Sequence, residues 1–104
     1  MTVFDDRKRS YEAKFAHDAE LRFKAQARRN QLLGDWAAEL LGKTGDDVQA
    51  YVREVIASDF EEAGDEDVAR KLIADLAGKA DEQTIRTKMA ELHELAREQI
   101  ANES

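Results

Sequence analysis

The sequence predicts an all-α fold, a four-helix bundle with a mobile N-terminal helical arm. The chain of 104 residues has no Pro and only five Gly, and it is rich in Ala, Glu, Lys, Leu and Arg. These residues lose the least free energy on entering a helix. Apolar residues recur at helical spacing in four stretches separated by Gly, and the connections are short. We therefore expect consecutive helices to pack nearly antiparallel.

The first helix of the bundle ends at Gly42 and contains the only Trp of the chain. Its apolar stripe consists of Leu32, Leu33, Trp36, Ala37, Leu40 and Leu41. Because Trp36 is the largest apolar side chain and lies in the middle of this stripe, we expect it at the centre of the bundle. From Leu21 onward, this helix is expected to run continuously into the stripe.

The second helix has the most regular pattern, with apolar residues at i, i+3, i+4, i+7, i+8 and i+12. They are Val48, Tyr51, Val52, Val55, Ile56 and Phe60. Thr44 with Asp47 resembles a capping box at the start of this helix, although Asp is shorter than the usual Glu. Gly64 is the expected C′ residue at its end.

Two further helices are predicted between acidic caps and the end of the chain. The third begins at an Asp65 cap, stops at Gly78 and carries the stripe Val68, Leu72, Ile73, Leu76 and Ala77. The fourth has Asp81 as its N-cap and runs for roughly five turns. Its stripe consists of Ile85, Met89, Leu92, Ala96 and Ile100.

The first part of the chain differs from the rest in charge. Up to Gln31 there are eight Lys and Arg against five Asp and Glu, and from Leu32 onward there are eight against eighteen, so a net charge of +3 precedes one of −10. The chain thus consists of a basic arm on an acidic body, and such arms commonly bind another molecule. We assign residues 1–19 to the arm and residues 20–104 to the bundle.

The arm is too poor in apolar residues to pack stably on its own body. Phe4, Tyr11 and Phe15 fall at i, i+7 and i+11, which is one side of a helix. Burying them contributes roughly 5–8 kcal/mol, whereas ordering about fifteen residues costs on the order of 20 kcal/mol before hydrogen bonding offsets part of it. We therefore expect a mobile arm that becomes a stable helix in a partner's groove. The alternative is a solvated extension of the first bundle helix.

Composition excludes several classes of function. Without Cys, the chain has no disulfide and no thiolate metal site, which suits a reducing compartment. We expect a cytoplasmic protein, because the N-terminus lacks an apolar signal region and no apolar run could insert into a membrane. The acidic body would be repelled by nucleic acid, and acidic residues dilute the basic patch of Lys24, Arg28 and Arg29, so nucleic-acid binding is a minor alternative.

No catalytic, metal or cofactor site is predicted. His17 lies near Asp18 and Glu20, but one His with two carboxylates is a poor ligand set, and a surface His is the better interpretation. His93 is expected to be a half-buried structural residue. The chain offers no pairing of nucleophile and base, so we expect that it is not an enzyme.

Two short motifs have weak functional alternatives. Gly42-Lys43-Thr44 resembles the end of a phosphate-binding loop, but Ala37 stands where that motif needs Gly, and a helix precedes it in place of a strand. Asp65-Glu66-Asp67 could in principle hold a divalent cation. Acidic residues are also what the first turn of a helix favours, and this is the better interpretation.

Several runs of residues resemble the zeta inhibitor subunit of alphaproteobacterial F-type ATP synthases. The N-terminal runs are Phe4-Asp5-Asp6-Arg7, Glu12 to Asp18, Leu21 to Ala25, Arg28-Arg29-Asn30, Leu32-Leu33-Gly34 and Trp36 to Gly42. The later ones are Asp59-Phe60-Glu61-Glu62, Gly64 to Val68, Ile85-Arg86 and Lys88-Met89. The resemblance covers nearly the whole chain and is densest from Phe4 to Gly42.

This resemblance implies a four-helix body and an inhibitory N-terminal segment, from Met1 to about Ala19. The segment would enter the catalytic head between alpha and beta subunits, near the gamma subunit, and block rotation in the direction of ATP hydrolysis. The protein would be a monomer when free, and a peripheral subunit on the membrane-bound synthase. The expected partner-binding residues are Phe4, Asp5, Asp6, Arg7, Lys8, Arg9, Tyr11, Lys14, Phe15 and His17. The alternative function is that of a helical adaptor or scaffold whose arm binds another partner.

Overall fold

The computed structural model describes residues 3–60 and 64–103, and side chains from Ala19 onward within these ranges. Over these residues the all-α class is confirmed, with four helices and no strand. The helices are α1 (Val3–Leu40), α2 (Asp46–Ser58), α3 (Glu66–Asp75) and α4 (Glu82–Glu103). None of the described helices is both long and apolar enough to cross a membrane.

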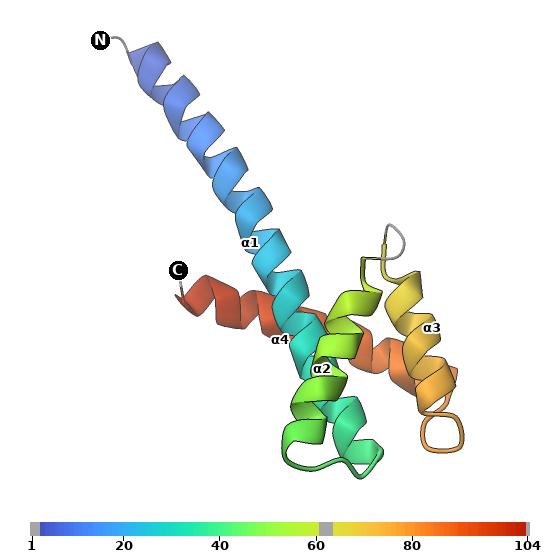
Figure 1. Ribbon diagram of the computed structural model, residues 1–104. Coiled ribbons are helices and arrows are strands. Elements are labelled where there is room, and N and C mark those ends of the chain that lie inside the picture. The colour runs from blue at the N-terminus through green and yellow to red at the C-terminus, as the bar shows by residue number, and fades with distance from the viewer. Residues whose placement is uncertain (1–2, 61–63, 104) are drawn as a thin grey trace.

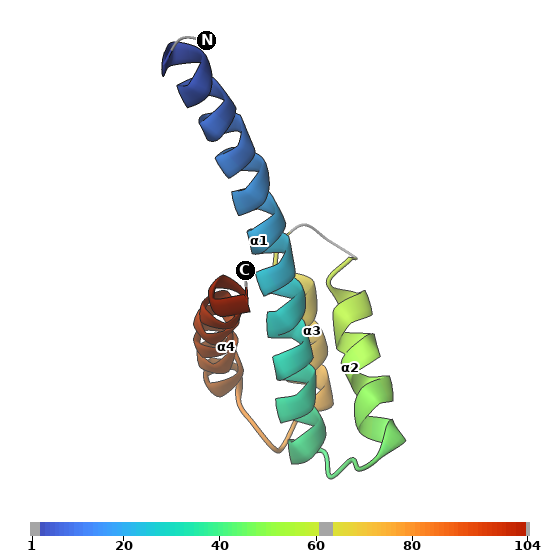
Figure 2. The same ribbon diagram turned by 90° about the vertical axis from the view of Figure 1, so that its left-hand side faces the viewer.

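The long helix α1 organises the fold. Its C-terminal half packs between α2 on one side and α4 on the other, with α3 behind, while its N-terminal half projects beyond the other helices (Figures 1 and 2). α1 continues without a break from Val3 to Leu40, which confirms the expected join from Leu21 onward. α1 and α2 run antiparallel as predicted. α4 instead crosses α3 steeply, so nearly antiparallel packing does not extend to this last pair of consecutive helices.

The core lies where the four helices meet. Its fully buried members include Leu33, Ala37, Val55, Val68, Leu72, Leu76 and Ile85. α1 and α2 approach each other closely at Gly34, because a Cβ atom at this position would lie 2.8 Å from Val52 Cα and 2.9 Å from its Cγ2. Only a residue without a side chain fits between the two backbones.

Two predicted helix ends are confirmed. After α1, Gly42 adopts φ 74°, its N–H donates to Glu39 O, and the Lys43 N–H donates to Ala38 O over 3.0 Å. These bonds form a Schellman turn, in which Gly accepts the left-handed conformation without strain. At the start of α4, Asp81 Oδ1 accepts a hydrogen bond from the Thr84 N–H over 2.7 Å, as an N-cap residue does.

Two other predicted ends are wrong, and a third is only partly right. α2 begins at Asp46 after Gly45, with no side-chain cap, so Thr44 and Asp47 form no capping box. It ends at Ser58, which leaves Gly64 too far along the chain to be its C′ residue. Asp65 does precede α3, but its side chain makes no cap hydrogen bond. Its carboxylate lies 2.8 Å from a buried arginine of α1 and is engaged there instead.

Two large side chains predicted for the core lie elsewhere. Trp36 is only half-buried at the edge of the core, with Lys88 Nζ 5.9 Å from its ring. The indole faces α4, since Thr84 and Lys88 of that helix line the same shallow pocket as Trp36. Phe60 is 76% exposed. The chain tightens after α2, because Asp59 and Phe60 donate to carbonyls three residues back, and this turn rotates Phe60 out of the stripe.

The stripes also end earlier than their sequence patterns suggest. Leu40, in the last turn of α1, is 37% exposed. Ala77 is exposed as well, since α3 ends at Asp75 and Ala77 lies in the turn that follows. A stripe read from sequence predicts burial only while the helix continues and a neighbouring helix covers it.

Candidate partner-binding surface

The predicted partner-binding residues all lie on the N-terminal part of α1. They are Phe4, Asp5, Asp6, Arg7, Lys8, Arg9, Tyr11, Lys14, Phe15 and His17. Their side chains lie outside the described residues, so their roles stay predictions. The structure does describe the base of the arm, from Ala19 to Asn30, where α1 joins the rest of the protein.

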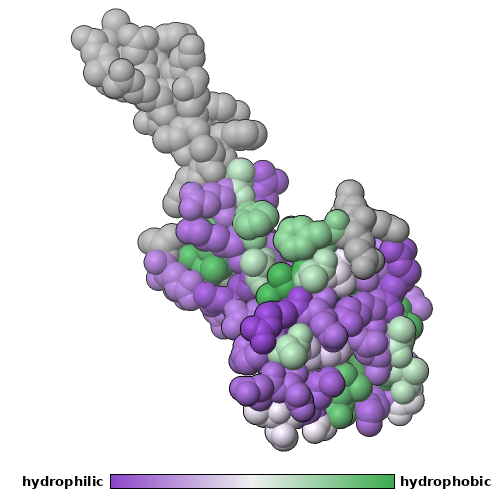
Figure 3. Space-filling model, viewed as in Figure 1, coloured by the Kyte–Doolittle hydropathy of each residue, from purple (hydrophilic) through white to green (hydrophobic). Residues whose placement is uncertain are grey.

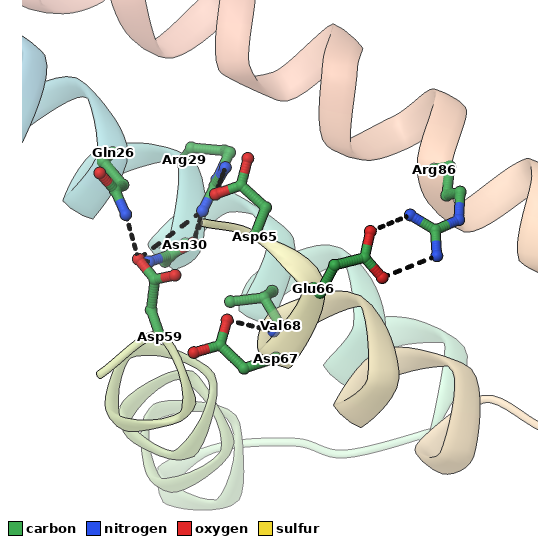
Figure 4. Close-up of polar contacts among 9 residues, drawn as sticks. All are labelled: Gln26, Arg29, Asn30, Asp59, Asp65, Glu66, Asp67, Val68 and Arg86. Carbon is green, nitrogen blue, oxygen red and sulfur yellow. Dashed lines mark hydrogen bonds and ion pairs between the residues drawn. The ribbon is translucent and has the colours of Figure 1, made fainter. Parts of the chain in front are cut away.

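A buried arginine holds the base of the arm to the body. Arg29 is only 2% exposed. Its Nε and Nη2 donate to Asn30 Oδ1 over 3.1 and 2.8 Å. Its Nη1 lies 2.8 Å from Asp65 Oδ1, and its Nη2 lies 3.7 Å from Asp59 Oδ2 (Figure 4). A charge is tolerated in such a place only with partners, so this network ties α1 to the end of α2 and the start of α3.

Asp59 is the second centre of the same network. Its Oδ2 accepts hydrogen bonds from the side-chain amides of Gln26 and Asn30, the latter over 2.9 Å (Figure 4). Its Oδ1 is buried and has no hydrogen-bond partner among the residues described. Gln26, Arg29 and Asn30 stand at i, i+3 and i+4, so a single face of α1 carries all three. Their number and burial make this face of the base rigid.

The other side of the base is tied to the end of α4. Arg28 Nη1 donates to Gln99 Oε1 over 2.8 Å, and Arg28 Nη2 lies 2.8 Å from Glu103 Oε1. His93 is half-buried, as predicted, and its Nδ1 has no hydrogen-bond partner in the described part of the chain. Beside these contacts, α1 and α4 form a groove of about 950 Å³, whose walls include Leu21, Ala25, His93 and Ile100.

The acidic run at the start of α3 is engaged with protein groups. Asp65 pairs with the buried arginine described above, and Asp67 Oδ1 accepts the Val68 N–H over 2.8 Å (Figure 4). Glu66 pairs with Arg86 at 3.0 Å, and the hydrogen bond from this guanidinium lowers the pKa of the Glu66 carboxyl. Within the described ranges, no group of three or more His, Cys, Asp or Glu could hold a metal ion.

The Gly42–Thr44 loop lacks the setting of a phosphate-binding loop. It follows helix α1, whereas the phosphate-binding motif follows a strand. Lys43 Nζ lies 5.6 Å from the centre of the Tyr51 ring, which places its charge over an aromatic face. The first turn of α2 then brings Asp46 and Asp47, whose negative charge opposes that of a phosphate.

The buried arginine was not predicted from the sequence, although a signal for it exists. Arg29 precedes Leu33 by four residues and Trp36 by seven, so it lies on the apolar face of α1. A charged residue at such a position indicates a buried ion pair, but it does not identify the partners. Asp59 and Asp65 are about thirty or more positions away, and only the tertiary structure brings them to the arginine.

Comparisons with known proteins agree with the fold. A model of the family described as ATPase inhibitor subunit zeta matches residues 1–99. A protein whose structure was determined in solution by NMR is 51% identical to this chain, with a TM-score of 0.74. That match covers 81% of this chain and 99% of the other protein. Among curated proteins none matches.

The fold and the family match together indicate a small all-α protein of a regulatory class, the ATPase inhibitors. The chain belongs to the ATPase inhibitor subunit zeta family. The resemblance seen in the sequence is therefore confirmed at the level of the family.

Proposed function

We propose that the protein inhibits ATP hydrolysis by the F-type ATP synthase, by inserting its N-terminal segment into the catalytic head. The arm, residues 1–19, enters an interface between the alpha and beta subunits near the gamma subunit. It then blocks rotation in the hydrolytic direction, while the body stays outside as a peripheral subunit. Membership of the ATPase inhibitor subunit zeta family is the observation that carries this proposal.

The form of α1 supports an arm that reaches into another molecule. α1 has 38 residues, which at 1.5 Å per residue corresponds to roughly 57 Å. Its C-terminal half packs against other helices, and the backbone of its N-terminal half extends past them (Figures 1 and 2). A helix that extends past its own body can lie in a groove of a partner and contact it along a row of residues at i, i+3, i+4 and i+7.

The charge distribution also supports separate roles for the arm and the body. The first 31 residues carry a net charge of +3 and the rest carry −10. Charges of the same sign repel between two molecules, so the two parts favour different surroundings. We assign entry into the head to the arm, and we place the acidic body on the outside.

The composition of the arm suits an inhibitor whose binding is reversible. Phe4, Tyr11 and Phe15 offer only a thin apolar seam, and ordering the arm on binding offsets part of the contact energy. The net affinity is then lower than the contact area alone would give. Rotation driven in the direction of synthesis can therefore expel the arm.

A hydrolysis assay tests the proposal. The full chain should suppress ATP hydrolysis by the cognate synthase head, and a variant that lacks Met1 to Asp18 should not. Among the described side chains, the buried apolar ones all lie at or after Ala25, so the truncated chain should keep its helical circular dichroism and its cooperative unfolding. A full-length variant with Ser in place of Phe4, Tyr11 and Phe15 is the matched control for chain length. Unchanged inhibition by the truncated chain would refute the proposal.

A further inference from the structure

Two phenylalanines, 37 positions apart in the chain, are exposed on the body. Phe23 on α1 is 68% exposed, and Phe60 after α2 is 76% exposed. Single exposed apolar residues are common, but neighbouring exposed aromatic rings mark a candidate binding surface, because aromatic residues are enriched at protein interfaces. In Figure 3, hydrophobic residues gather on the viewer's side, where α1 leaves the body and α2 ends.

The buried network places the two rings on the same side of the molecule. Phe23 lies one helical turn before Gln26, and Phe60 directly follows Asp59. The Gln26 side chain donates to Asp59 Oδ2, so the two backbone segments that carry the rings are joined by a direct hydrogen bond. We call Phe23 and Phe60 together the aromatic pair.

The aromatic pair sits on a support that binding need not order. Asp59 is held by Gln26 and by Asn30, which in turn accepts two hydrogen bonds from the buried Arg29. Backbone segments fixed before binding need not be ordered when a partner covers the side chains that they carry. Burial of the pair would therefore add to affinity without a large ordering cost, in contrast to burial of the arm.

We infer that the aromatic pair is a second contact with the catalytic head of the ATPase, and that it docks into an apolar pocket beside the groove that receives the arm. This inference rests on the proposed function. Phe23 follows the predicted anchor Phe15 by eight residues on the same helix, which is about 12 Å. A head that holds the arm therefore lies within reach of the pair.

The size of the pair favours the head over a second copy of this chain as its occupant. Two aromatic side chains bury on the order of 300–500 Å². A stable interface between two proteins needs about 800 Å² on each side, so the pair alone is too small to hold a dimer. As an extension of the surface of the arm, the same area adds to a complex that has already formed.

Substitution of the pair separates this inference from the proposed function. The double variant Phe23→Ala with Phe60→Ala should raise the half-inhibitory concentration in the hydrolysis assay by roughly tenfold or more, with full inhibition still reached at saturation. Leu95→Ala is the matched control, because Leu95 is a 40% exposed apolar residue of α4. It should change the half-inhibitory concentration by less than about twofold.

Two measurements accompany the assay. Urea unfolding should show equal stability for wild type and the double variant, since both rings are exposed. If the double variant inhibits as well as wild type, the inference is wrong and the proposed function stands. If wild type itself does not inhibit, the proposed function fails and the inference fails with it. Sedimentation equilibrium should show monomers, and a dimer that the double variant abolishes would identify a second copy as the occupant and overturn the inference.

Discussion

Replacing Arg29 by Met should lower the free energy of unfolding by about 2–4 kcal/mol. Met keeps much of the apolar stem but removes the guanidinium. The Asp59 side chain is only 8% exposed, and it would stay buried without a cationic partner. One of its oxygens would keep the two amide donors Gln26 and Asn30, while the other has no hydrogen-bond partner in the described structure even now.

The magnitude follows from the surroundings of the two carboxylates. Removing one partner of a buried ion pair costs about 3–5 kcal/mol. The Asp59 contact is long, at 3.7 Å, and two amide donors remain, so the loss of this contact costs about 2–3 kcal/mol, at or below the lower end of this range. Asp65 has a shorter contact of 2.8 Å, but its side chain is 54% exposed. Its loss of a partner therefore adds at most about 1 kcal/mol.

Urea unfolding, followed by circular dichroism, measures this loss. With a denaturant dependence of about 2 kcal/mol per molar, the midpoint should fall by about 1–2 M. Arg28→Met is the matched control, since Arg28 is 28% exposed and pairs with Glu103 at the surface, and it should cost less than about 1 kcal/mol. Adding Asp59→Asn to Arg29→Met should recover part of the loss, because the unpaired charge is removed. Equal losses from the two Arg substitutions would refute the reasoning.

Three further predictions concern the body. Gly34→Ala should destabilise the fold by about 1–2 kcal/mol in thermal unfolding, because overpacking against the α2 backbone outweighs the gain in helix propensity; a more stable variant would contradict the close approach. Asp81→Ala should cost about 1 kcal/mol through the lost N-cap bond and Thr44→Ala less than about 0.5 kcal/mol, so equal losses would show that the caps are misassigned. The hydrogen bond from Arg86 lowers the pKa of Glu66 from its ordinary 4.5, so this carboxylate stabilises the fold above that pH and the contribution is lost as the pH falls through the folded pKa. Glu66→Gln should therefore weaken the fall in the free energy of unfolding at acidic pH. An unchanged pH dependence would contradict the Glu66–Arg86 pair.

Most of the fold could be predicted because its helices are amphipathic and end in local signals. Gly42 and Asp81 act through residues within one turn of themselves, so the sequence pattern contains the whole interaction. Val55 and Leu72 lie at the middle of their stripes, and they are fully buried as predicted. At these positions local preference and tertiary packing agree.

The predictions that failed did so because of contacts and turns that form only in the tertiary structure. Trp36 lies in the middle of a stripe, but its ring lies at the edge of the core, beside Lys88 of α4. Asp65 occupies the predicted cap position, yet its carboxylate pairs with Arg29 from another helix. Phe60 continues a helical spacing past the last turn of the helix that carried it. Each depends on a neighbour or a turn geometry that periodicity alone does not specify.

The residues of the candidate binding surface also fall into those that the sequence predicts and those that only the tertiary structure shows. Phe4, Tyr11 and Phe15 follow from spacing and composition, and they stay predictions for the arm. Phe23 and Phe60 could not be paired from sequence, because the turn after α2 and the Gln26–Asp59 hydrogen bond bring their segments together.

Amide hydrogen exchange of the free and bound protein tests the central claim most directly. In the free protein, the amides of residues 4–15 should exchange almost unprotected, whereas those of residues 33–38, in the packed half of α1, should be strongly protected. After addition of the synthase head, residues 4–15 should become protected as well. Equal protection of the two segments in the free protein, or no gain in the arm on binding, would contradict an arm that acquires its stable structure in the partner.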